Sequence, residues 1–170
     1  MSIIKKFIFI IFLTTFGNQI NAEEVKKMGT HKDWETYIIN SEKGKVCFAQ
    51  SKPVLQAPKT STREARLFIS FRPGENIANE ISVTGGYEFN NKNLVKVISG
   101  KNKYEFDLMQ DGFAWMSDEK NKLEKKMIKT MKKGSRIMVK GYTQNGSQTI
   151  DHYSLLGFTK AYNATKANCS

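Results

Sequence analysis

The β character of this chain is clearest in the stretch RIMVKGYTQNGSQTIDHYSL, which covers residues 136–155. β-branched and aromatic residues flank Asn145-Gly146 on both sides, and Asn-Gly is the dipeptide that most favours a tight hairpin turn. The stretch therefore predicts two antiparallel strands, 136–142 and 149–155, joined by a short turn.

Similar short strands are expected over most of the chain before this hairpin. We predict them at 34–39, 45–50, 66–71, 80–84, 94–98, 103–108 and 112–116. The piece between Pro53 and Pro58 is expected to be irregular. Many short strands separated by Gly, Asn and Pro turns predict a mainly β domain. A β-sandwich is the first interpretation and a β-barrel is the alternative.

One helix is expected to interrupt the strands in the C-terminal third, over residues 118–133. Ser117 or Asp118 can cap its start, and Gly134 can end it. Its apolar stripe is formed by Leu123, Met127, Ile128 and Met131, which recur at helical spacing. A short terminal helix or turn is expected from residue 157.

The first 22 residues have the organisation of a secretory signal peptide. Lys5 and Lys6 precede a short apolar run, 7–13, and the chain then turns polar up to Ala22, after which we expect cleavage. The run is far shorter than the roughly 20 apolar residues that span a membrane. We therefore predict a periplasmic, outer-envelope or secreted protein. Its expected parts are a signal peptide (1–22), a loose leader (23–33) and a single β-sandwich domain (34–170).

Two cysteines, Cys47 and Cys169, remain after cleavage. In an oxidising compartment an even pair is interpreted first as a disulfide. A redox pair or a catalytic thiol is the alternative, but the chain has no Cys-x-x-Cys and no histidine close to either cysteine in sequence. We predict a structural Cys47–Cys169 disulfide that ties the end of the chain to an early strand.

The chain is strongly basic, with a net charge of +11. Cleavage after Ala22 removes two lysines and no acid, which leaves +9. The expected helix is the most basic element, and its candidate anion-binding residues are Lys122, Lys125, Lys126, Lys129, Lys132 and Lys133. They suit anionic lipid or lipopolysaccharide. The alternatives are a solvated helix face and a lysine-rich composition typical of an A+T-rich genome. Export and the lack of an aromatic stacking platform argue against nucleic acid.

No constellation for catalysis is evident in the sequence. The two histidines are His31, in the leader, and His152, in a predicted strand. Asp151 and Tyr153 point away from His152, and Ser154 on its own face lies roughly 7 Å away along a strand, too far for a hydrogen bond. Two distant histidines also cannot supply the three or four clustered ligands of a zinc site. We therefore expect no enzyme activity, no metal and no cofactor.

Several landmarks together resemble a known family. They are Trp34, Cys47 with Ala49, Arg72-Pro73, Phe113-Ala114-Trp115, Met131-Lys132-Lys133-Gly134, Gly141-Tyr142, the segment 153–161 (YSLLGFTKA) and the terminal Cys169. The set, which runs over roughly 34–169, is similar to the invasion-associated locus B family of α-proteobacterial exported proteins. The resemblance implies an immunoglobulin-like β-sandwich in the periplasm or outer envelope. The family is associated with host-cell invasion in some pathogens, and the resemblance implies no catalytic residue.

Three functional hypotheses follow. The first is a non-enzymatic envelope protein that binds an envelope or host protein or a surface. The second is a periplasmic hydrolase or redox enzyme, which requires a concave pocket around His152. The third is an electrostatic binder of anionic lipid or lipopolysaccharide through the lysine-rich helix.

Trp34 and Trp115 are interpreted as core anchors.

Overall fold

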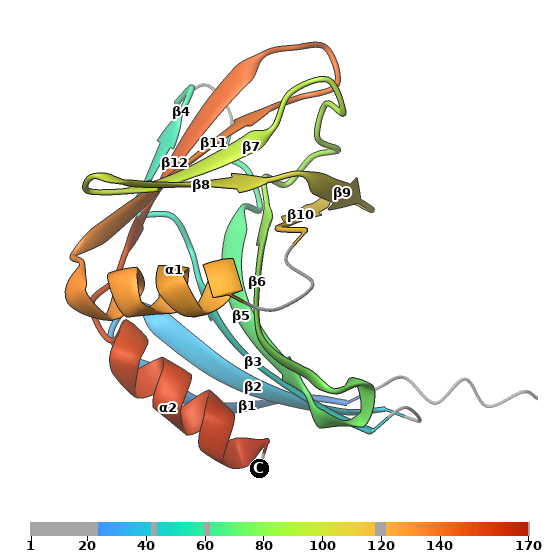
Figure 1. Cartoon of the computed structure of the whole chain (residues 1–170), viewed down its shortest axis with the longest axis vertical. Helices are drawn as coiled ribbons and strands as arrows, with labels where there is room; N and C mark the ends of the chain where they lie inside the picture. Colours follow the sequence, from blue (N-terminus) through green and yellow to red (C-terminus); the bar gives the residue numbers. More distant parts are fainter. Residues whose placement is uncertain (1–23, 42–43, 60–61, 118–121, 170) are drawn as a thin grey trace, which may run out of the picture.

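Two antiparallel β-sheets and two helices make up the computed structural model of this chain (Figure 1). The structure describes residues 24–41, 44–59, 62–117 and 122–169. The predicted signal peptide, 1–22, lies outside the described residues. None of the described helices is long and apolar enough to cross a membrane.

The larger sheet has seven strands in the order β1-β2-β3-β5-β6-β10-β9. Its strands are β1 (Val25–His31), β2 (Trp34–Ser41), β3 (Gly44–Ser51), β5 (Arg66–Arg72), β6 (Ile77–Thr84), β9 (Leu108–Gln110) and β10 (Phe113–Trp115). A single 3₁₀ turn, η1 (Pro73–Glu75), joins β5 to β6.

The smaller sheet has five strands in the order β4-β12-β11-β7-β8. Its strands are β4 (Leu55–Ala57), β7 (Val95–Ser99), β8 (Asn102–Phe106), β11 (Arg136–Tyr142) and β12 (Gln148–Ser154). The predicted hairpin forms, with pairing from Arg136–Ser154 to Tyr142–Gln148. Its loop spans 143–147 and is longer than a two-residue turn, because Thr143 N–H donates to the Ser147 carbonyl.

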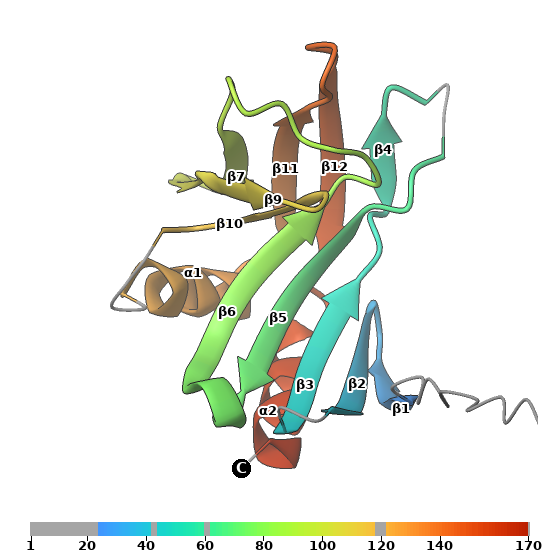
Figure 2. The ribbon, with the colours of Figure 1, turned by 90° about the vertical axis from the view of Figure 1, so that its right-hand side faces the viewer.

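The core lies between the two sheets and under the helices α1 (Lys122–Lys133) and α2 (Phe158–Asn168) (Figures 1 and 2). Buried and more exposed residues alternate along β3, β7, β11 and β12, as a two-residue repeat requires. Fully buried side chains from both sheets meet there, among them Leu67, Ile69, Ile81, Phe106, Ile137 and Tyr153. The mainly β fold and its sandwich-like layering are therefore confirmed.

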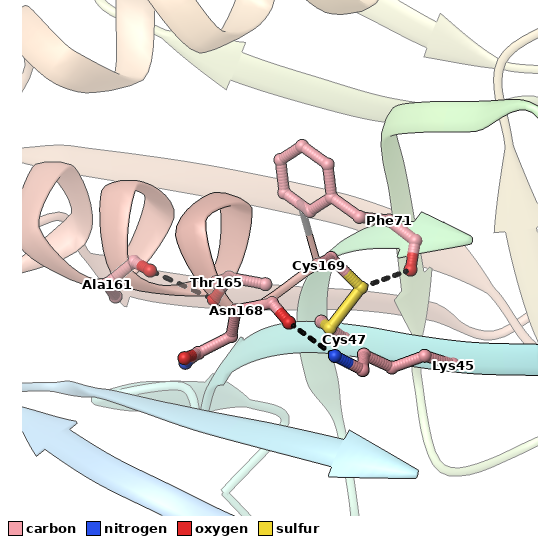
Figure 3. Close-up of a disulfide and its surroundings, with 7 residues drawn as sticks. All are labelled: Lys45, Cys47, Phe71, Ala161, Thr165, Asn168 and Cys169. Carbon is pink, nitrogen blue, oxygen red and sulfur yellow. Dashed lines mark hydrogen bonds between the residues drawn. A yellow bond between two sulfur atoms is a disulfide. The ribbon is translucent and has the colours of Figure 1, made fainter. Parts of the chain in front are cut away.

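The C-terminal helix α2 is held against the large sheet by an aromatic contact and by a disulfide, which Figure 3 shows. The Tyr162 ring packs on Phe71, with the centroids 5.7 Å apart, and its hydroxyl donates to Asn79 Oδ1. Directly after the helix, Cys169 is bonded to Cys47 of β3, and the two Cα atoms are 5.8 Å apart. The structure thus has the Cys47–Cys169 bond that the sequence predicts.

Several sequence expectations need correction. The leader 23–33 is not loose, because β1 pairs with β2 from Val25–Ile39 to His31–Trp34. The piece between Pro53 and Pro58 contains β4, which pairs with β12. The terminal helix or turn expected from residue 157 is a helix, α2, whose apolar residues fill the end of the core.

The immunoglobulin-like topology is not confirmed. In the large sheet β1, β2, β3, β5 and β6 are neighbours almost in chain order, as in a meander. An immunoglobulin sheet instead places its fifth strand beside its second.

The outer face of the large sheet carries a row of partly exposed aromatic rings. The row comprises Tyr37, Phe48, Phe68, Phe113 and Trp115, with successive centroids 5.2 to 6.0 Å apart. Trp34 is a core anchor, with no exposed area, but Trp115 belongs to this outer row, so its core assignment is wrong. Cross-strand aromatic contacts of this kind stabilise a sheet from its solvent side.

Candidate functional site

A groove with a volume of about 710 Å³ lies where the end of α1 meets the β7–β8 turn and the start of β11. These segments come together at the left of Figure 1. The basic side chains that line the groove are Lys101, Lys126, Lys129, Lys133 and Arg136. We call it the cationic groove.

The floor of the cationic groove is polar and tied to all three segments. Ser99 is buried and its hydroxyl donates to the Arg136 carbonyl at 3.3 Å. The Thr130 hydroxyl of α1 is hydrogen-bonded to Tyr104 of β8 at 2.8 Å. A Cβ at Gly134 would lie only 3.0 Å from a Leu155 methyl group, so glycine allows the close approach of α1 to β12.

No carboxylate belongs to the lining of this groove. None of the five groove cations takes part in the ion pairs found among the described residues. Like charges gathered in one concavity repel each other and raise the local positive potential. An anion in the groove would relieve that repulsion.

The six lysines predicted as an anion-binding face do not act as one surface. Lys126, Lys129 and Lys133 line the cationic groove, whereas Lys122 and Lys125 are exposed outside its lining. Lys132 points elsewhere, since its Nζ lies 3.9 Å from the centre of the Tyr162 ring.

The helix α1 is fixed by a buried face that differs from the predicted stripe at one position. Met127, Ile128 and Met131 are buried as expected, but Leu123 is 47% exposed. Glu124 is buried in its place and accepts a hydrogen bond from Ile81 N–H of β6 at 3.1 Å. The carboxylate therefore joins the helix to β6 at Ile81, just beyond the three residues of β6 that pair with β10.

A second cavity, of about 540 Å³, differs from the cationic groove because its basic lining residue, Arg72, is paired with carboxylates. Arg72 donates to both carboxylate oxygens of Glu80 at 2.8 Å and to Glu75 at 3.2 Å. The hydrogen bonds to Glu80 are the main reason that the pKa of Arg72 is raised.

The residues considered for catalysis do not come together in a cavity. His152 lies on the outer face of the small sheet between Met138 and Leu55, and it is absent from the lining of the cavities described here. The Ser154 hydroxyl accepts the Leu156 N–H. His31 ends β1.

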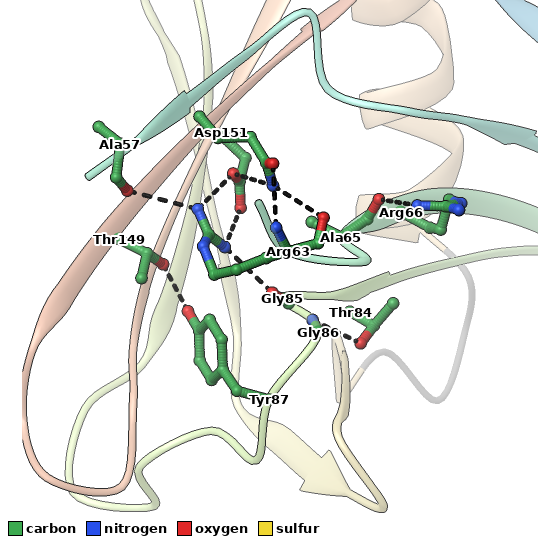
Figure 4. Close-up of polar contacts among 11 residues, drawn as sticks. Ala57, Arg63, Ala65, Arg66, Thr84, Gly85, Gly86, Tyr87, Thr149 and Asp151 are labelled. Carbon is green, nitrogen blue, oxygen red and sulfur yellow. Dashed lines mark hydrogen bonds and ion pairs between the residues drawn. The ribbon is translucent and has the colours of Figure 1, made fainter. Parts of the chain in front are cut away.

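Asp151, next to His152, points inward to a buried ion pair (Figure 4). Arg63 donates to both Asp151 oxygens, at 2.7 and 3.0 Å, and also to the carbonyls of Ala57 and Gly85. The two side chains are 9% and 3% exposed. No sequence pattern singles out Arg63, whose partner is 88 residues away. The pair joins the chain before β5 to β12.

In the described part of the chain, histidine, cysteine, aspartate and glutamate form no group of three or more that could hold a metal ion.

The segment that most specifies the family resemblance has a clear structural role. Trp34 Nε1 donates to the Ser154 carbonyl at 3.0 Å, and the Trp34 and Phe158 rings meet edge to face with centroids 4.9 Å apart. Gly157 has a φ of 92°, and a Cβ there would lie 1.9 Å from the His31 carbonyl oxygen. The segment therefore locks the start of α2 onto β1 and β2.

A family model described as Invasion associated locus B (IalB) protein matches residues 34–166, which begin at this tryptophan and include the cationic groove. The chain belongs to the IalB family. The sequence resemblance is thereby confirmed, and Trp34, Gly157 and Phe158 of this IalB family member are seen to carry packing rather than chemistry. No curated protein and no solved structure matches the chain.

Proposed function

We propose that this IalB family member is an exported, non-enzymatic binding protein of the bacterial envelope, and that its cationic groove holds a phosphate-bearing ligand of the lipopolysaccharide type. One observation carries the proposal. Cations from three separate segments of the chain converge on one groove that has no carboxylate in its lining.

A purely structural explanation accounts for only part of this charge. Lysines in the last turn of a helix complement the negative end of its dipole, which explains Lys132 and Lys133. It does not explain Lys101 or Arg136, which come from the β7–β8 turn and the first residue of β11. The dipole also disfavours an anion at this helix end, so the ligand must be bound by the side chains.

Hydroxyl groups and lysines in one groove suit phosphate better than an isolated carboxylate. Ser135 stands among the lining residues, and its hydroxyl can donate a hydrogen bond to a phosphate oxygen, whereas the Thr130 hydroxyl already donates to the Lys126 carbonyl. Several lysines can neutralise a ligand that carries more than one phosphate group.

Two features support the envelope part of the proposal. The first 22 residues read as a signal peptide, and the Cys47–Cys169 disulfide suits an oxidising compartment. Lipopolysaccharide is the abundant polyphosphorylated ligand on that side of a Gram-negative inner membrane.

The test is calorimetric titration with two probes, lipopolysaccharide and the soluble polyphosphate myo-inositol hexakisphosphate. The groove variant is Lys129→Gln with Lys133→Gln. The matched control is Lys122→Gln with Lys125→Gln, which removes the same charge from the same helix outside the groove. Because each lysine near an anionic surface contributes roughly 1 kcal/mol, we expect the groove variant to weaken binding about tenfold or more and the control to change it little.

Equal losses in the two variants would refute a defined site and leave only diffuse charge. Binding that does not weaken between 50 and 200 mM salt would also contradict the proposal, because screening acts on exposed charges over roughly 10 Å.

A further inference from the structure

The outer face of the small sheet carries a row of side chains that is apolar except for His152, and we call it the apolar row. The strand register places Ile98 beside Met138, Met138 beside His152, and His152 beside Leu55, so four strands contribute one residue each. All four are partly or well exposed, and Leu55 is 45% exposed. Ile150 lies in the next row of the same face, two residues from His152 along β12.

Cations surround this row. Lys103 is paired with Ile98, at one end of the apolar row, and Arg136 precedes Met138 by two residues on the same face of β11. Lys96 and Lys140 occupy directly opposite positions on β7 and β11.

The Lys96–Lys140 pairing is unfavourable in the isolated protein. Like charges directly opposite each other destabilise an antiparallel pair. Lys96 has Glu105 as its neighbour on the other side, so one acid stands against the four cations of this face. Within the described residues, the ion pairs of the structure include neither Lys96 nor Lys140.

This face is continuous with the cationic groove. Arg136 lines the groove and also begins the outer face of β11, and Lys101 of the groove lies in the turn that leads to Lys103. A ligand surface that reaches the groove can therefore also reach the sheet.

We infer that the outer face of the small sheet docks flat on an anionic bilayer surface, with Leu55, Ile98 and Met138 at the level of the headgroups and Lys96 and Lys140 on lipid phosphates. The inference deepens the proposed function and rests on it, because it states how a groove for phosphate-bearing ligands meets the membrane that displays them. Apolar side chains bordered by lysines are the chemistry that an anionic lipid surface binds.

Charge disfavours the other occupants of this face. A second copy packed symmetrically would bring Lys96 and Lys140 of one molecule close to the same residues of the other. A soluble anion would use the lysines and leave the apolar row exposed to water. An anionic leaflet would contact both the lysines and the apolar row.

The experiment is co-sedimentation of the purified protein with vesicles of phosphatidylcholine alone or with 30% phosphatidylglycerol. The charge variant is Lys96→Gln with Lys140→Gln, and the apolar variant is Leu55→Gln with Met138→Gln. The matched charge control, Lys26→Gln with Lys160→Gln, removes two exposed lysines from β1 and α2.

We expect binding to the anionic vesicles only. The charge variant should lose about tenfold or more, since each surface lysine contributes roughly fivefold. The apolar variant should also bind measurably less, because it removes two of the three apolar anchors. The control should bind as the unaltered protein does. All three variants should keep their affinity for myo-inositol hexakisphosphate, and near-ultraviolet circular dichroism should show an unchanged fold.

Face variants that sediment like the control would overturn the inference while the proposed function stands, provided that the soluble polyphosphate still binds. Loss of polyphosphate binding in the Lys129→Gln, Lys133→Gln variant is the separate readout for the groove. Light scattering that shows a dimer of the unaltered protein and a monomer of the Leu55→Gln, Met138→Gln variant would also overturn the inference, because the face would then be an interface between two copies.

Discussion

Removing the Cys47–Cys169 disulfide should lower the stability of the protein without changing its folded structure. The bond closes a loop with a sequence separation of 122 residues. For a loop of that length, the chain-entropy relation gives a stabilisation of about 5 kcal/mol through the unfolded state. Measured disulfides often contribute less than this limit, so we expect Cys47→Ala with Cys169→Ala to lower the free energy of unfolding by about 3 to 5 kcal/mol.

The folded state should survive because other contacts hold α2. Tyr162 packs on Phe71 and donates to Asn79, and Phe158 packs on Trp34. Urea unfolding followed by tryptophan fluorescence measures the free energy, and near-ultraviolet circular dichroism reports the packing of the buried Trp34.

The unaltered protein under a reducing agent is the matched control, and it should unfold at the same urea concentration as the double variant. A loss below about 1 kcal/mol would refute the entropic reasoning. A double variant that loses its near-ultraviolet signal without urea would refute the claim that the bond acts on the unfolded state. Two free thiols in the non-reduced protein, found by mass spectrometry, would refute the bond itself.

Two further predictions concern buried positions. Asp151→Asn should lower the free energy of unfolding in urea by about 3 to 5 kcal/mol, because it leaves the Arg63 guanidinium buried without a carboxylate. The apolar double variant Arg63→Met with Asp151→Leu should recover much of that loss. Equal stability of Asp151→Asn and the unaltered protein would contradict the argument. Gly157→Ala should lower the free energy of unfolding by about 2 to 5 kcal/mol, because its backbone is left-handed and a Cβ would clash with the end of β1. Gly100 also has a positive φ but open space around it, so Gly100→Ala should lower it by only about 1 to 2 kcal/mol. Similar losses at both glycines would argue against the clash.

The fold was predictable where local pattern and packing agree. The stretch 136–155 combines β-branched residues with a turn dipeptide, and both features favour the hairpin that β11 and β12 form. The leader was not predictable in the same way. β1 is lysine-rich, its first four residues are exposed, and it is a strand because β2 offers it an edge, which no local propensity reveals.

The site was only half predictable, for a related reason. Helical spacing and charge single out Lys126, Lys129 and Lys133, which are close in sequence. Lys101 and Arg136 reach the groove through the β7–β8 turn and the start of β11, so only the sheet register brings them beside the helix. Charge counting along one element cannot separate lysines that line a groove from Lys122 and Lys125, which stand outside it.

The burial of the α1 stripe at first argues against a membrane role. A helix that lies on a bilayer needs apolar anchors on its lipid side. In α1, Met127, Ile128 and Met131 are instead buried in the core. That objection applies to α1 as the docking element, and it does not apply to the small sheet. The sheet presents its apolar residues outward on alternate positions, so the anchors and the lysines come from different elements of one surface. If the outer face does meet the bilayer, α1 supplies charge to the groove beside it, and the buried stripe is what holds those lysines in place.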